Sequence, residues 1–461
     1  MGTQPPRRVG EDIAVLAFFF LFYANIAVLA THFHGVPSFV SSAVVLLLFI
    51  PLARYLVVER QPLVVTPVLP LVLVFFGALF LACVFSKNPS VSQSAIPTYL
   101  TEGLIVYLIV TNALRTTATL RKVVWVLVLA GAFMGALSVF QEFTHTYAND
   151  YGGLAQVDRI DDGGGFNVAP QDSSQKVLRP RLAGPLGSEN RYAQILAAVL
   201  PLALILAFRE RHRGLRLAAA VCSLFILGGL LLTFSRGAAL AVAITLLAMA
   251  VLREIPIRQL VGALAVVTLL VALIVPDYIT RLRSLESVTA ISQSSDSSQH
   301  VDSSILGRKT ENLAAWHTFL DNPVLGVGPG VYFKDYSRDY GNRLGVRYLA
   351  SERRGHSLYL EMAADTGIIG LGAFLTMAGT AMVLLLQAAK RWRRYDPERS
   401  QLASCFFFAL LGYLTCGAFL QLSYQRYFWV LLALGSSTLW ALRRDEEQGL
   451  ARPRGDTEKL A

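Results

Sequence analysis

The sequence at residues 356–370 reads HSLYLEMAADTGIIG, and it marks the point where a long polar segment passes into an apolar one. His356 therefore stands where a predicted membrane helix meets water. An imidazole exchanges protons near neutral pH, so this position suits chemistry between a lipid-borne and a water-borne substrate. The alternative is structural, because a single histidine at a helix start also serves as a capping or packing group.

The composition of the whole chain indicates a membrane protein. Of the 461 residues, 54% are hydrophobic and 16% are charged, whereas about 25% of a typical soluble protein is charged. Apolar blocks of roughly 17 to 25 residues recur along the chain, and a block of this length spans a bilayer. The formal net charge of +10 is therefore no signal for nucleic acid, and we expect the lipid bilayer as the partner surface.

We predict an all-α polytopic membrane protein with about twelve transmembrane helices. The predicted spans are centred near residues 20, 46, 75, 105, 132, 198, 224, 244, 267, 376, 410 and 435. The first is expected to be retained as a helix and not removed as a signal peptide. The fourth is expected to begin irregularly, because Thr101, Glu102 and Gly103 lie early in it.

Lys and Arg residues are distributed unevenly over the predicted loops. Twenty lie in the loops of one set, and three, Lys87, Arg236 and Arg426, lie in the short loops of the other set. Loops rich in Lys and Arg stay in the cytoplasm, so we expect both chain ends there. We expect spans one to nine in residues 1–275, with an outer loop at about 141–187, and spans ten to twelve in 356–445. Residues 446–461 would form a cytoplasmic tail.

The segment 276–355 is predicted to be a long outer loop or lid that contains helices. Its first part, residues 284–304, is rich in Ser, Gln and Asp and is expected to be mobile. Residues 305–320 are expected to be helical, because Leu313, Trp316 and Leu320 form an apolar stripe. Asn322-Pro323 ends this helix, and the glycines of residues 326–330 predict a tight irregular turn.

Arg236 is the most unusual charge in the sequence. It lies in LLTFSRG, residues 231–237, a very short turn between two apolar blocks. A charge at this depth in a membrane is costly, and it marks a functional site by default. The structural alternative is an arginine at a helix end whose long side chain reaches the interface.

Three arginines flank the start of the sixth predicted span: Arg179, Arg181 and Arg191. Ser188 is a candidate N-cap of that helix. Backbone N–H groups at a helix N-terminus form an anion site together with arginine, whose planar fork binds two phosphate oxygens at once. Anchoring of these arginines to lipid headgroups is the alternative.

Metal chemistry is not favoured by the sequence. Asp161-Asp162 lies in a Gly-rich loop without a further carboxylate at ligand spacing, and His32 and His34 have no acidic neighbour. The four cysteines all lie within apolar blocks and are expected to be small core residues. We therefore predict no metal site and no cofactor, so that arginines would neutralise any phosphate charge.

The motif around His356 resembles a known family. His356-Ser357, nine residues, Gly367, two residues and Gly370 match the His-[Asn/Ser/Gln]-x9-Gly-x-x-Gly pattern of bacterial O-antigen ligases. The segment TFSRGA at residues 233–238 is similar to the Ser-Arg-Gly turn of the wider superfamily. That superfamily also contains O-antigen polymerases and protein O-oligosaccharyltransferases. LGSENRYA at 186–193 resembles its Gly-x-x-Asn-x-x-Ala segment, and residues 308–330 resemble its loop helix and turn.

The resemblance implies a glycosyltransferase of the bacterial inner membrane with a periplasmic active site. The donor would be O-antigen on undecaprenyl diphosphate, and the acceptor would be a sugar of the lipid A–core oligosaccharide. His356 would accept the proton of the acceptor hydroxyl, while Arg191 and Arg236 stabilise the leaving diphosphate. A single displacement inverts the anomeric centre. A polymerase, a protein O-glycosylating enzyme and a lipid-glycan flippase or exporter are the alternatives.

Four further cations are candidate substrate-binding residues: Lys87, Arg181, Arg308 and Arg354. Arg308 opens the predicted loop helix, and Arg354 lies two residues before His356. Any of these side chains would suit anionic lipid or core sugar phosphates. For Arg354 the alternative is a solvated surface residue.

The uneven loop charges predict the orientation of the chain. A reporter fused after about residue 340 is expected to read as periplasmic, and one fused after about residue 395 as cytoplasmic. Paired alkaline phosphatase and fluorescent protein fusions measure this directly. A cytoplasmic reading for the 276–355 loop would contradict the topology and the mechanism that depends on it.

Overall fold

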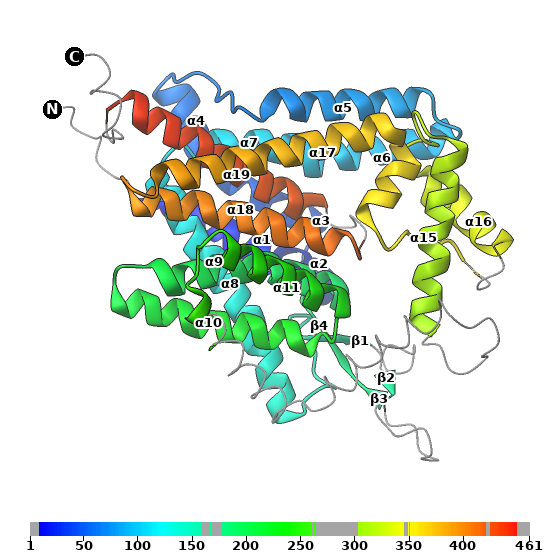
Figure 1. Ribbon diagram of the computed structural model, residues 1–461, viewed down its shortest axis with the longest axis horizontal. Coiled ribbons are helices and arrows are strands. Elements are labelled where there is room, and N and C mark those ends of the chain that lie inside the picture. Colours follow the sequence, from blue (N-terminus) through cyan, green and yellow to red (C-terminus); the bar gives the residue numbers. More distant parts are fainter. Residues whose placement is uncertain are drawn as a thin grey trace.

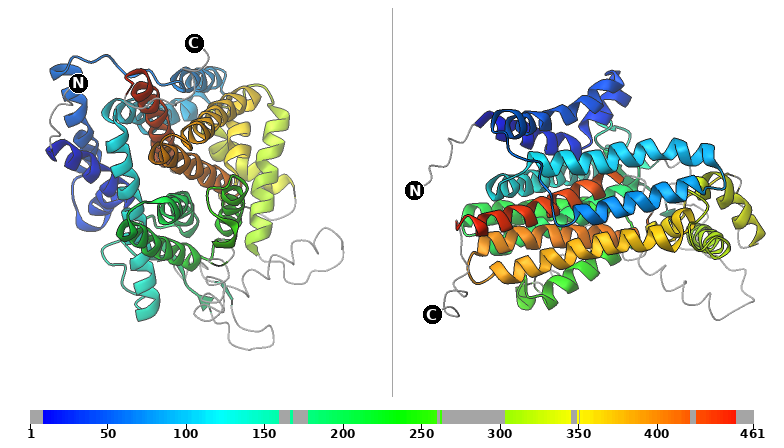
Figure 2. Two further views of the ribbon diagram at one scale, coloured as in Figure 1. Left: turned by 60° about the vertical axis from the view of Figure 1, so that its left-hand side comes forward. Right: turned by 90° about the horizontal axis from the view of Figure 1, so that it is seen from above.

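The computed structural model describes residues 9–158, 166–167, 178–259, 262, 303–344, 349, 351–420 and 425–449. In this part of the chain, long helices lie side by side in one bundle (Figure 1), and the two further views show the same arrangement (Figure 2). The helix α15 crosses one end of the bundle instead of joining it. The ninth predicted span and residues 284–302 of the segment predicted to be mobile lie outside the described residues, whereas residues 303 and 304 of that segment are helical and belong to α15 (Ser303–Asp321).

The first part of the chain forms short and irregular helices followed by long ones. Its helices are α1 (Val9–Tyr23), α2 (Ile26–His34), α3 (Ser38–Ala43), η1 (Val44–Leu48), α4 (Phe49–Ala53), η2 (Arg54–Val58), α5 (Leu69–Val84), α6 (Pro89–Tyr99), η3 (Leu100–Ile105), α7 (Val106–Ala113) and α8 (Thr117–Thr144). The π-helix η3 confirms the irregular start of the fourth predicted span. The backbone of Asn25 is in the left-handed region and interrupts the helix between α1 and α2. The two helices are bent by 58° relative to one another.

The second part contains four short strands and the helices that carry the candidate site. Its elements are β1 (Gln156–Asp158), β2 (Phe166–Asn167), β3 (Leu178–Arg179), β4 (Arg181–Gly184), α9 (Glu189–Arg209), α10 (Arg213–Leu232), α11 (Arg236–Val251), α15 (Ser303–Asp321), η5 (Tyr332–Tyr336), α16 (Ser337–Arg343), α17 (Leu358–Trp392), α18 (Pro397–Gly417) and α19 (Gln425–Glu447). The strands form two antiparallel pairs, β1 with β4 and β2 with β3. The helix predicted at residues 305–320 is confirmed as α15.

The described helices agree with a polytopic membrane protein but do not confirm twelve spans. Seven are long and apolar enough to cross a bilayer, or eight if the bent pair α1–α2 counts as one span. At the third and eighth predicted spans, α5 and α11 are apolar but have only 16 residues each. At the twelfth, α19 is not among the seven. The total number of spans stays a prediction.

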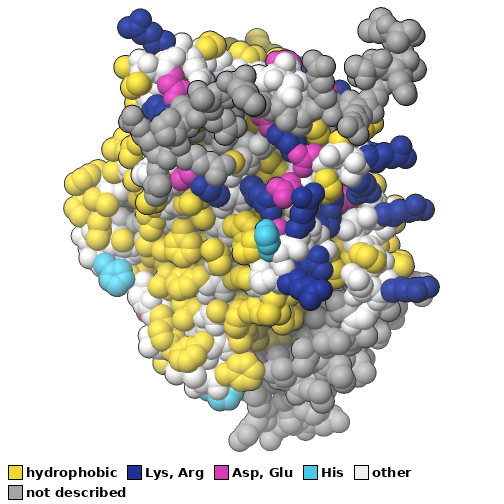
Figure 3. Space-filling model, turned by 90° about the vertical axis from the view of Figure 1, so that its left-hand side faces the viewer, with side chains coloured by type: hydrophobic (Ala, Val, Ile, Leu, Met, Phe, Trp, Pro, Cys, Tyr) yellow, Lys and Arg dark blue, Asp and Glu magenta, His cyan; other side chains and the backbone are white. Residues whose placement is uncertain are grey.

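Buried acids neutralise the arginines at the end of the bundle where α19 finishes. Arg121 at the start of α8 lies 2.9 Å from Glu210, and Arg209 lies 2.5 Å from Glu254, which also pairs with Arg393. Glu210 and Glu254 are 1% and 5% exposed. The face at this end gathers Lys and Arg side chains with Asp and Glu among them (Figure 3). Loss of one partner would leave an uncompensated buried charge, which costs about 3–5 kcal/mol.

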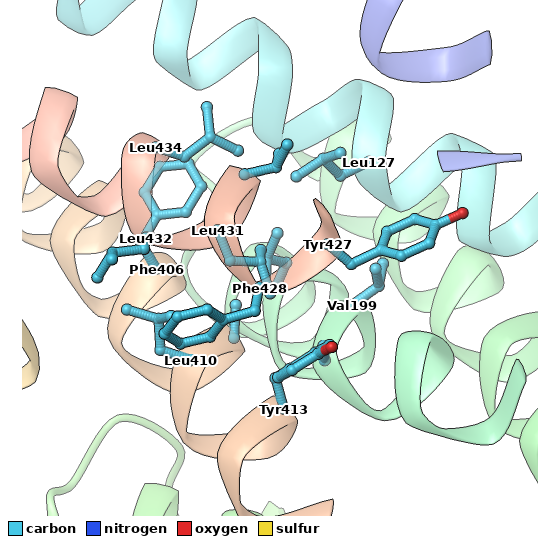
Figure 4. Packing of buried hydrophobic residues seen from close by; sticks show 14 of the residues in the cluster. Leu127, Val199, Phe406, Leu410, Tyr413, Tyr427, Phe428, Leu431, Leu432 and Leu434 are labelled. Carbon is cyan, nitrogen blue, oxygen red and sulfur yellow. The ribbon is translucent and has the colours of Figure 1, made fainter. Parts of the chain in front are cut away.

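The core lies where α8, α9, α18 and α19 meet. Aromatic and aliphatic side chains from these helices interdigitate, including Leu127, Val199, Phe406 and Phe428 (Figure 4). Tyr413 on α18 and Tyr427 on α19 are fully buried beside them. Close packing of this kind fixes the positions of α9, α17 and α18 relative to one another. The starts of α9, α11 and α17 therefore have fixed places at the opposite end of the bundle.

A glycine turn docks into a break in α17. Gly367 has φ 62° and ψ −165°, so α17 is interrupted there. The N–H groups of Val327 and Gly328 donate to the carbonyl groups of Ala364 and Asp365, each at 2.9 Å, and the N–H of Ile368 donates to Pro323 at 2.8 Å. The turn predicted at residues 326–330 is confirmed, since all three of its glycines have positive φ. Each free backbone group at the break thus finds a partner in the turn.

Gly367 cannot be replaced without moving the turn. A Cβ atom there would lie 2.2 Å from the carbonyl oxygen of Val324. The backbone region is one that essentially glycine alone adopts, and this region costs about 1–3 kcal/mol for other residues. We expect Gly367→Ala to lower the melting temperature of the purified protein in detergent.

Gly372 in the same helix provides a matched control, because nothing lies within 4 Å of a Cβ atom built there. Gly372→Ala is expected to leave the melting temperature unchanged or to raise it slightly, since alanine is the better helix former. Equal melting temperatures for the two variants would contradict the docking of the turn at Gly367.

Candidate functional site

His356 lies at the junction of the outer segment and α17, next to a buried carboxylate. Its Nε2 atom is 3.0 Å from Oε2 of Glu311 on α15. Glu311 is 3% exposed. Nδ1 of His356 is buried and has no hydrogen-bond partner among the described residues. The imidazole therefore lies next to a carboxylate that can stabilise positive charge on the ring.

Glu361 is a second buried carboxylate at this place, one turn into α17. Its Oε1 atom accepts a hydrogen bond of 2.8 Å from Arg354, and its Oε2 atom is buried without a hydrogen-bond partner among the described residues. The charges of Arg191 and His356 act on the same carboxylate. The start of α17 and the start of α9 therefore face one another across Glu361.

Ser357 explains where α17 begins. Its hydroxyl accepts the N–H of Leu360 at 3.4 Å, so Ser357 is the N-cap and His356 precedes the helix. The N–H of Leu358 donates to the carbonyl of Leu420 at the end of α18. These contacts fix the backbone of His356 from its C-terminal side, and Glu311 fixes the imidazole from α15.

The starts of α9 and α11 are joined by polar contacts. Arg181 on β4 lies 2.7 Å from Glu189 and donates at 3.2 Å to the carbonyl of Thr233. Asn190 accepts the hydroxyl of Ser235 at 2.9 Å. Ser188 occupies the N-cap position of α9, but its side chain makes no capping hydrogen bond, which corrects the sequence expectation.

Arg236 is the first residue of α11 and is buried, at 8% exposure. The turn before it is tight, because Phe234 has φ 51° and is itself buried. A buried first-turn position disfavours the alternative of a long side chain that reaches solvent. The buried guanidinium instead adds its charge to the positive N-terminal end of α11.

Charges from both parts of the site act on Arg308 of α15, namely from the residues around His356 and from those at the starts of α9 and α11. Burial lowers the pKa of its guanidinium, and the nearby positive charges of Arg181 and Arg236 lower it further. Glu189 and Glu311 act in the opposite direction. Three arginines thus share one region in which positive charge is in excess, and an anion bound there would relieve their repulsion.

Tyr332 and Asp365 hold α15 in this position. The Tyr332 hydroxyl donates to the carbonyl of Glu311 at 2.8 Å, and the carboxylate of Asp365 accepts the N–H groups of Gly330 and Tyr332 at 2.9 and 3.0 Å. Burial raises the pKa of the Tyr332 hydroxyl, as do the negative charges of Glu361, Glu311 and Asp365. The hydroxyl therefore stays protonated and can donate.

The structure brings most of the predicted site residues together. Contacts and charge interactions connect six of the seven: Arg181, Arg191, Arg236, Arg308, Arg354 and His356. Lys87 is exposed at the turn between α5 and α6, where its backbone N–H donates to Val327. In the described part of the chain, no hydrogen bond or ion pair joins its side chain to the other six.

Three acids of the site were missed in the sequence: Glu189, Glu311 and Glu361. Glu361 lies within the stretch that begins at His356, and Glu189 lies two residues before Arg191. Their closeness in sequence to these predicted site residues was the signal by which the two acids could have been found. Glu311 lies three residues after Arg308, but its contact with His356 had no sequence signal, because the two positions are 45 apart in the chain. The described residues contain no group of three or more His, Cys, Asp or Glu that could hold a metal ion.

The arrangement supports proton acceptance beside a region of excess positive charge. A comparison with known protein families shows which family the sequence around this site resembles. Residues 221–375 match the family model for O-antigen ligase. The match covers about a third of the chain, and it confirms the resemblance to the O-antigen ligase superfamily. No curated protein matches the chain.

The matched O-antigen ligase segment contains Arg236, Arg308, Arg354 and His356, together with Glu311 and Glu361, which the sequence analysis missed. Members of this family are enzymes of the glycosyltransferase type, ligases and polymerases, that act on lipid-linked polysaccharides. Lys87, Arg181 and Arg191 precede the matched segment, and contacts in the fold join the last two of these to it.

Arg236 offers a test of the positive region. If its fork binds two oxygens of a diphosphate, Arg236→Lys is expected to retain a small part of the transfer rate. Arg236→Ala is expected to lose about 10²- to 10³-fold, as for removal of one donor to a developing anion. Single-turnover transfer rates measure both effects.

Arg338 on α16 provides the control for Arg236, because it is exposed on the same side of the molecule. Arg338→Ala is expected to transfer glycan at the wild-type rate. A well-expressed Arg236→Ala protein with normal turnover would remove Arg236 from the site.

Proposed function

We propose that the protein is an O-antigen ligase. It transfers O-antigen polysaccharide from undecaprenyl diphosphate to the lipid A–core oligosaccharide, with inversion and without a metal ion. The active site faces the periplasm in the bacterial inner membrane, and both chain ends lie in the cytoplasm. The proposed chemistry is a direct displacement in which a histidine accepts a proton and arginines stabilise the leaving diphosphate.

The observation that carries this proposal is the meeting of His356 and Glu311 with the positive region around Arg308. Proton acceptance and anion stabilisation are the two demands of glycan transfer from a lipid diphosphate. Both are found at one end of the bundle. Arg121 and Arg209, whose charges are neutralised by buried acids, lie at the opposite end. If the end with His356 faces the periplasm, the site would meet a lipid-linked donor at the periplasmic surface of the inner membrane.

In the proposed step, a hydroxyl oxygen of the core sugar attacks the anomeric carbon of the donor. The bond between this carbon and the diphosphate oxygen breaks, and its electron pair leaves with the diphosphate. The hydroxyl proton passes to the imidazole of His356, and the carboxylate of Glu311 beside Nε2 stabilises the imidazolium. The attack comes from the side opposite the leaving group, so the anomeric configuration inverts.

The arginines lower the energy of the departing diphosphate. Arg236 and Arg308 are fixed on different helices, so their charges need little reorganisation when negative charge develops. Arg191 at the start of α9 adds a third charge near the N-terminal end of a helix, where anions bind well. Arg181 is held by Glu189 and serves as support for this region.

The acceptor distinguishes the ligase from its relatives, and one assay compares them. Purified protein is given undecaprenyl-linked glycan together with rough lipopolysaccharide, a second lipid-linked glycan or a peptide acceptor. A ligase glycosylates the rough lipopolysaccharide, a polymerase lengthens the lipid-linked glycan, and a protein O-glycosylating enzyme modifies the peptide. Transfer to none of these acceptors, with movement of the donor across proteoliposomes, would favour a flippase.

The same assay tests metal independence. Arginines replace a divalent cation in the proposed mechanism, so transfer is expected to continue in saturating EDTA. Addition of Mg²⁺ or Mn²⁺ to the chelated enzyme is the control. Loss of turnover that either ion restores would contradict the proposed mechanism.

The paired side chains of His356 and Glu311 give a further prediction. His356→Gln keeps hydrogen-bonding capacity but accepts no proton at neutral pH, and we expect it to lose about 10²- to 10⁴-fold in transfer rate. Glu311→Gln is expected to lose less, because the imidazole itself remains as proton acceptor.

His317 on the same helix as Glu311 is the matched control, and His317→Gln is expected to behave as the wild type. Donor binding by each variant, measured separately, shows that the protein is folded. Near-normal transfer by His356→Gln would show that the imidazole positions the acceptor and that the proton leaves by another route.

A further inference from the structure

A second cavity lies away from the candidate site, between the broken helix pair and the start of α19. It has a volume of about 470 Å³. Most of its wall is apolar and comes from α1, α2, η1 and α7, with side chains such as Phe22, Val28, Val44 and Val106. The polar part of the wall consists of Asn25, Thr101, Glu102 and Arg426. The cavity therefore combines an apolar surface with one carboxylate and one guanidinium.

Arg426 is held in place at the cavity wall. It donates to Oδ1 of Asn25 at 2.7 Å, and its guanidinium lies over the rings of Phe22 and Tyr427 at 5.5 and 5.3 Å. Aromatic faces attract a cation without neutralising it. The guanidinium is thereby fixed at the cavity wall.

Glu102 supplies the opposite charge. It lies in the π-helix η3, accepts a hydrogen bond from the backbone N–H of Arg426, and interacts with the Arg426 charge. Its carboxylate is only partly buried. An ionisable residue within a candidate membrane span is costly and marks a functional site by default. The regular helix is interrupted where Glu102 meets the cavity, as is common for π-helical turns at binding sites.

The surrounding elements indicate that the occupant is a lipid. η1 belongs to the candidate span Ser38–Val58, η3 belongs to Pro89–Ala113, and α1 and α2 form the bent pair. We expect the apolar wall of a cavity between such helices to meet acyl chains. The two opposite charges make the site nearly neutral overall, so a headgroup with both charges matches it better than a purely anionic one.

We propose that this cavity binds a zwitterionic phospholipid whose headgroup carries a primary ammonium, as in phosphatidylethanolamine. The guanidinium of Arg426 receives the phosphate, and the carboxylate of Glu102 accepts N–H groups of the ammonium. One acyl chain lies along Phe22, Val28 and Val44. A quaternary ammonium has no N–H to donate, and an anionic headgroup without an amine meets repulsion from Glu102.

The bound lipid would also lie next to residues that help to position the candidate site. Asn25, which receives Arg426, donates from Nδ2 to the carbonyl of Pro185 at 2.8 Å. Pro185 lies between Arg181 and Glu189, the ion pair at the start of α9. The cavity and the candidate site are therefore joined through one buried asparagine, although lipid binding itself does not rest on the proposed function.

Native mass spectrometry of the whole purified protein tests the proposal without donor or acceptor. The protein is titrated with phosphatidylethanolamine, phosphatidylcholine and phosphatidylglycerol that carry the same acyl chains. We expect the first bound lipid to be retained about tenfold more tightly for phosphatidylethanolamine than for either other lipid, as for one charge-assisted hydrogen bond.

Glu102→Gln is expected to remove the preference for phosphatidylethanolamine over phosphatidylcholine while phospholipid still binds through Arg426. Glu142→Gln is the matched control, since Glu142 is also a partly buried glutamate in a candidate span. It is expected to keep the full preference. Arg426→Gln is expected to weaken all three lipids.

Three results would overturn the proposal. One is equal binding of the three lipids by the wild type, which requires no variant and no folding control. Another is an unchanged preference in folded Glu102→Gln. The third is displacement of phosphatidylethanolamine from this site by an equimolar isoprenoid diphosphate, which would make the cavity part of the donor path instead.

Discussion

The docking of the glycine turn into the break of α17 is the constraint on which the site depends. Asp365 binds the N–H groups of Gly330 and Tyr332, and Tyr332 in turn donates to the carbonyl of Glu311. This chain of hydrogen bonds places α15 across the start of α17. Glu311 and His356 come from different segments of the chain, so their contact depends on this placement of α15.

The arginines at the two ends of the bundle have different charged surroundings. At the end where α19 finishes, Glu210 and Glu254 are buried and face the arginines as ion partners. At the other end, burial lowers the pKa of Arg308, and the positive charges of Arg181 and Arg236 lower it further. The first arrangement stabilises the fold, whereas the second prepares a place for an anion.

Several features could be predicted because they depend on local sequence. The helix α15, the turn at residues 326–330 and the irregular start of the fourth predicted span all follow from residue periodicity, glycine and proline. The number of spans could not be confirmed in the same way. Apolarity gives the position of a block, but the lengths of α5 and α11 and the bend between α1 and α2 come from packing.

Among site residues, the sequence by itself determined that His356, Arg191 and Arg236 stand at helix starts next to polar segments. It also determined the spacing from His356 to Gly367, which matches the distance between the helix start and the break. The tertiary structure decided which of these residues meet. It joined Arg308 to the cluster, left Lys87 outside it, and buried Glu311 beside the imidazole, because contacts between distant segments depend on how whole helices pack.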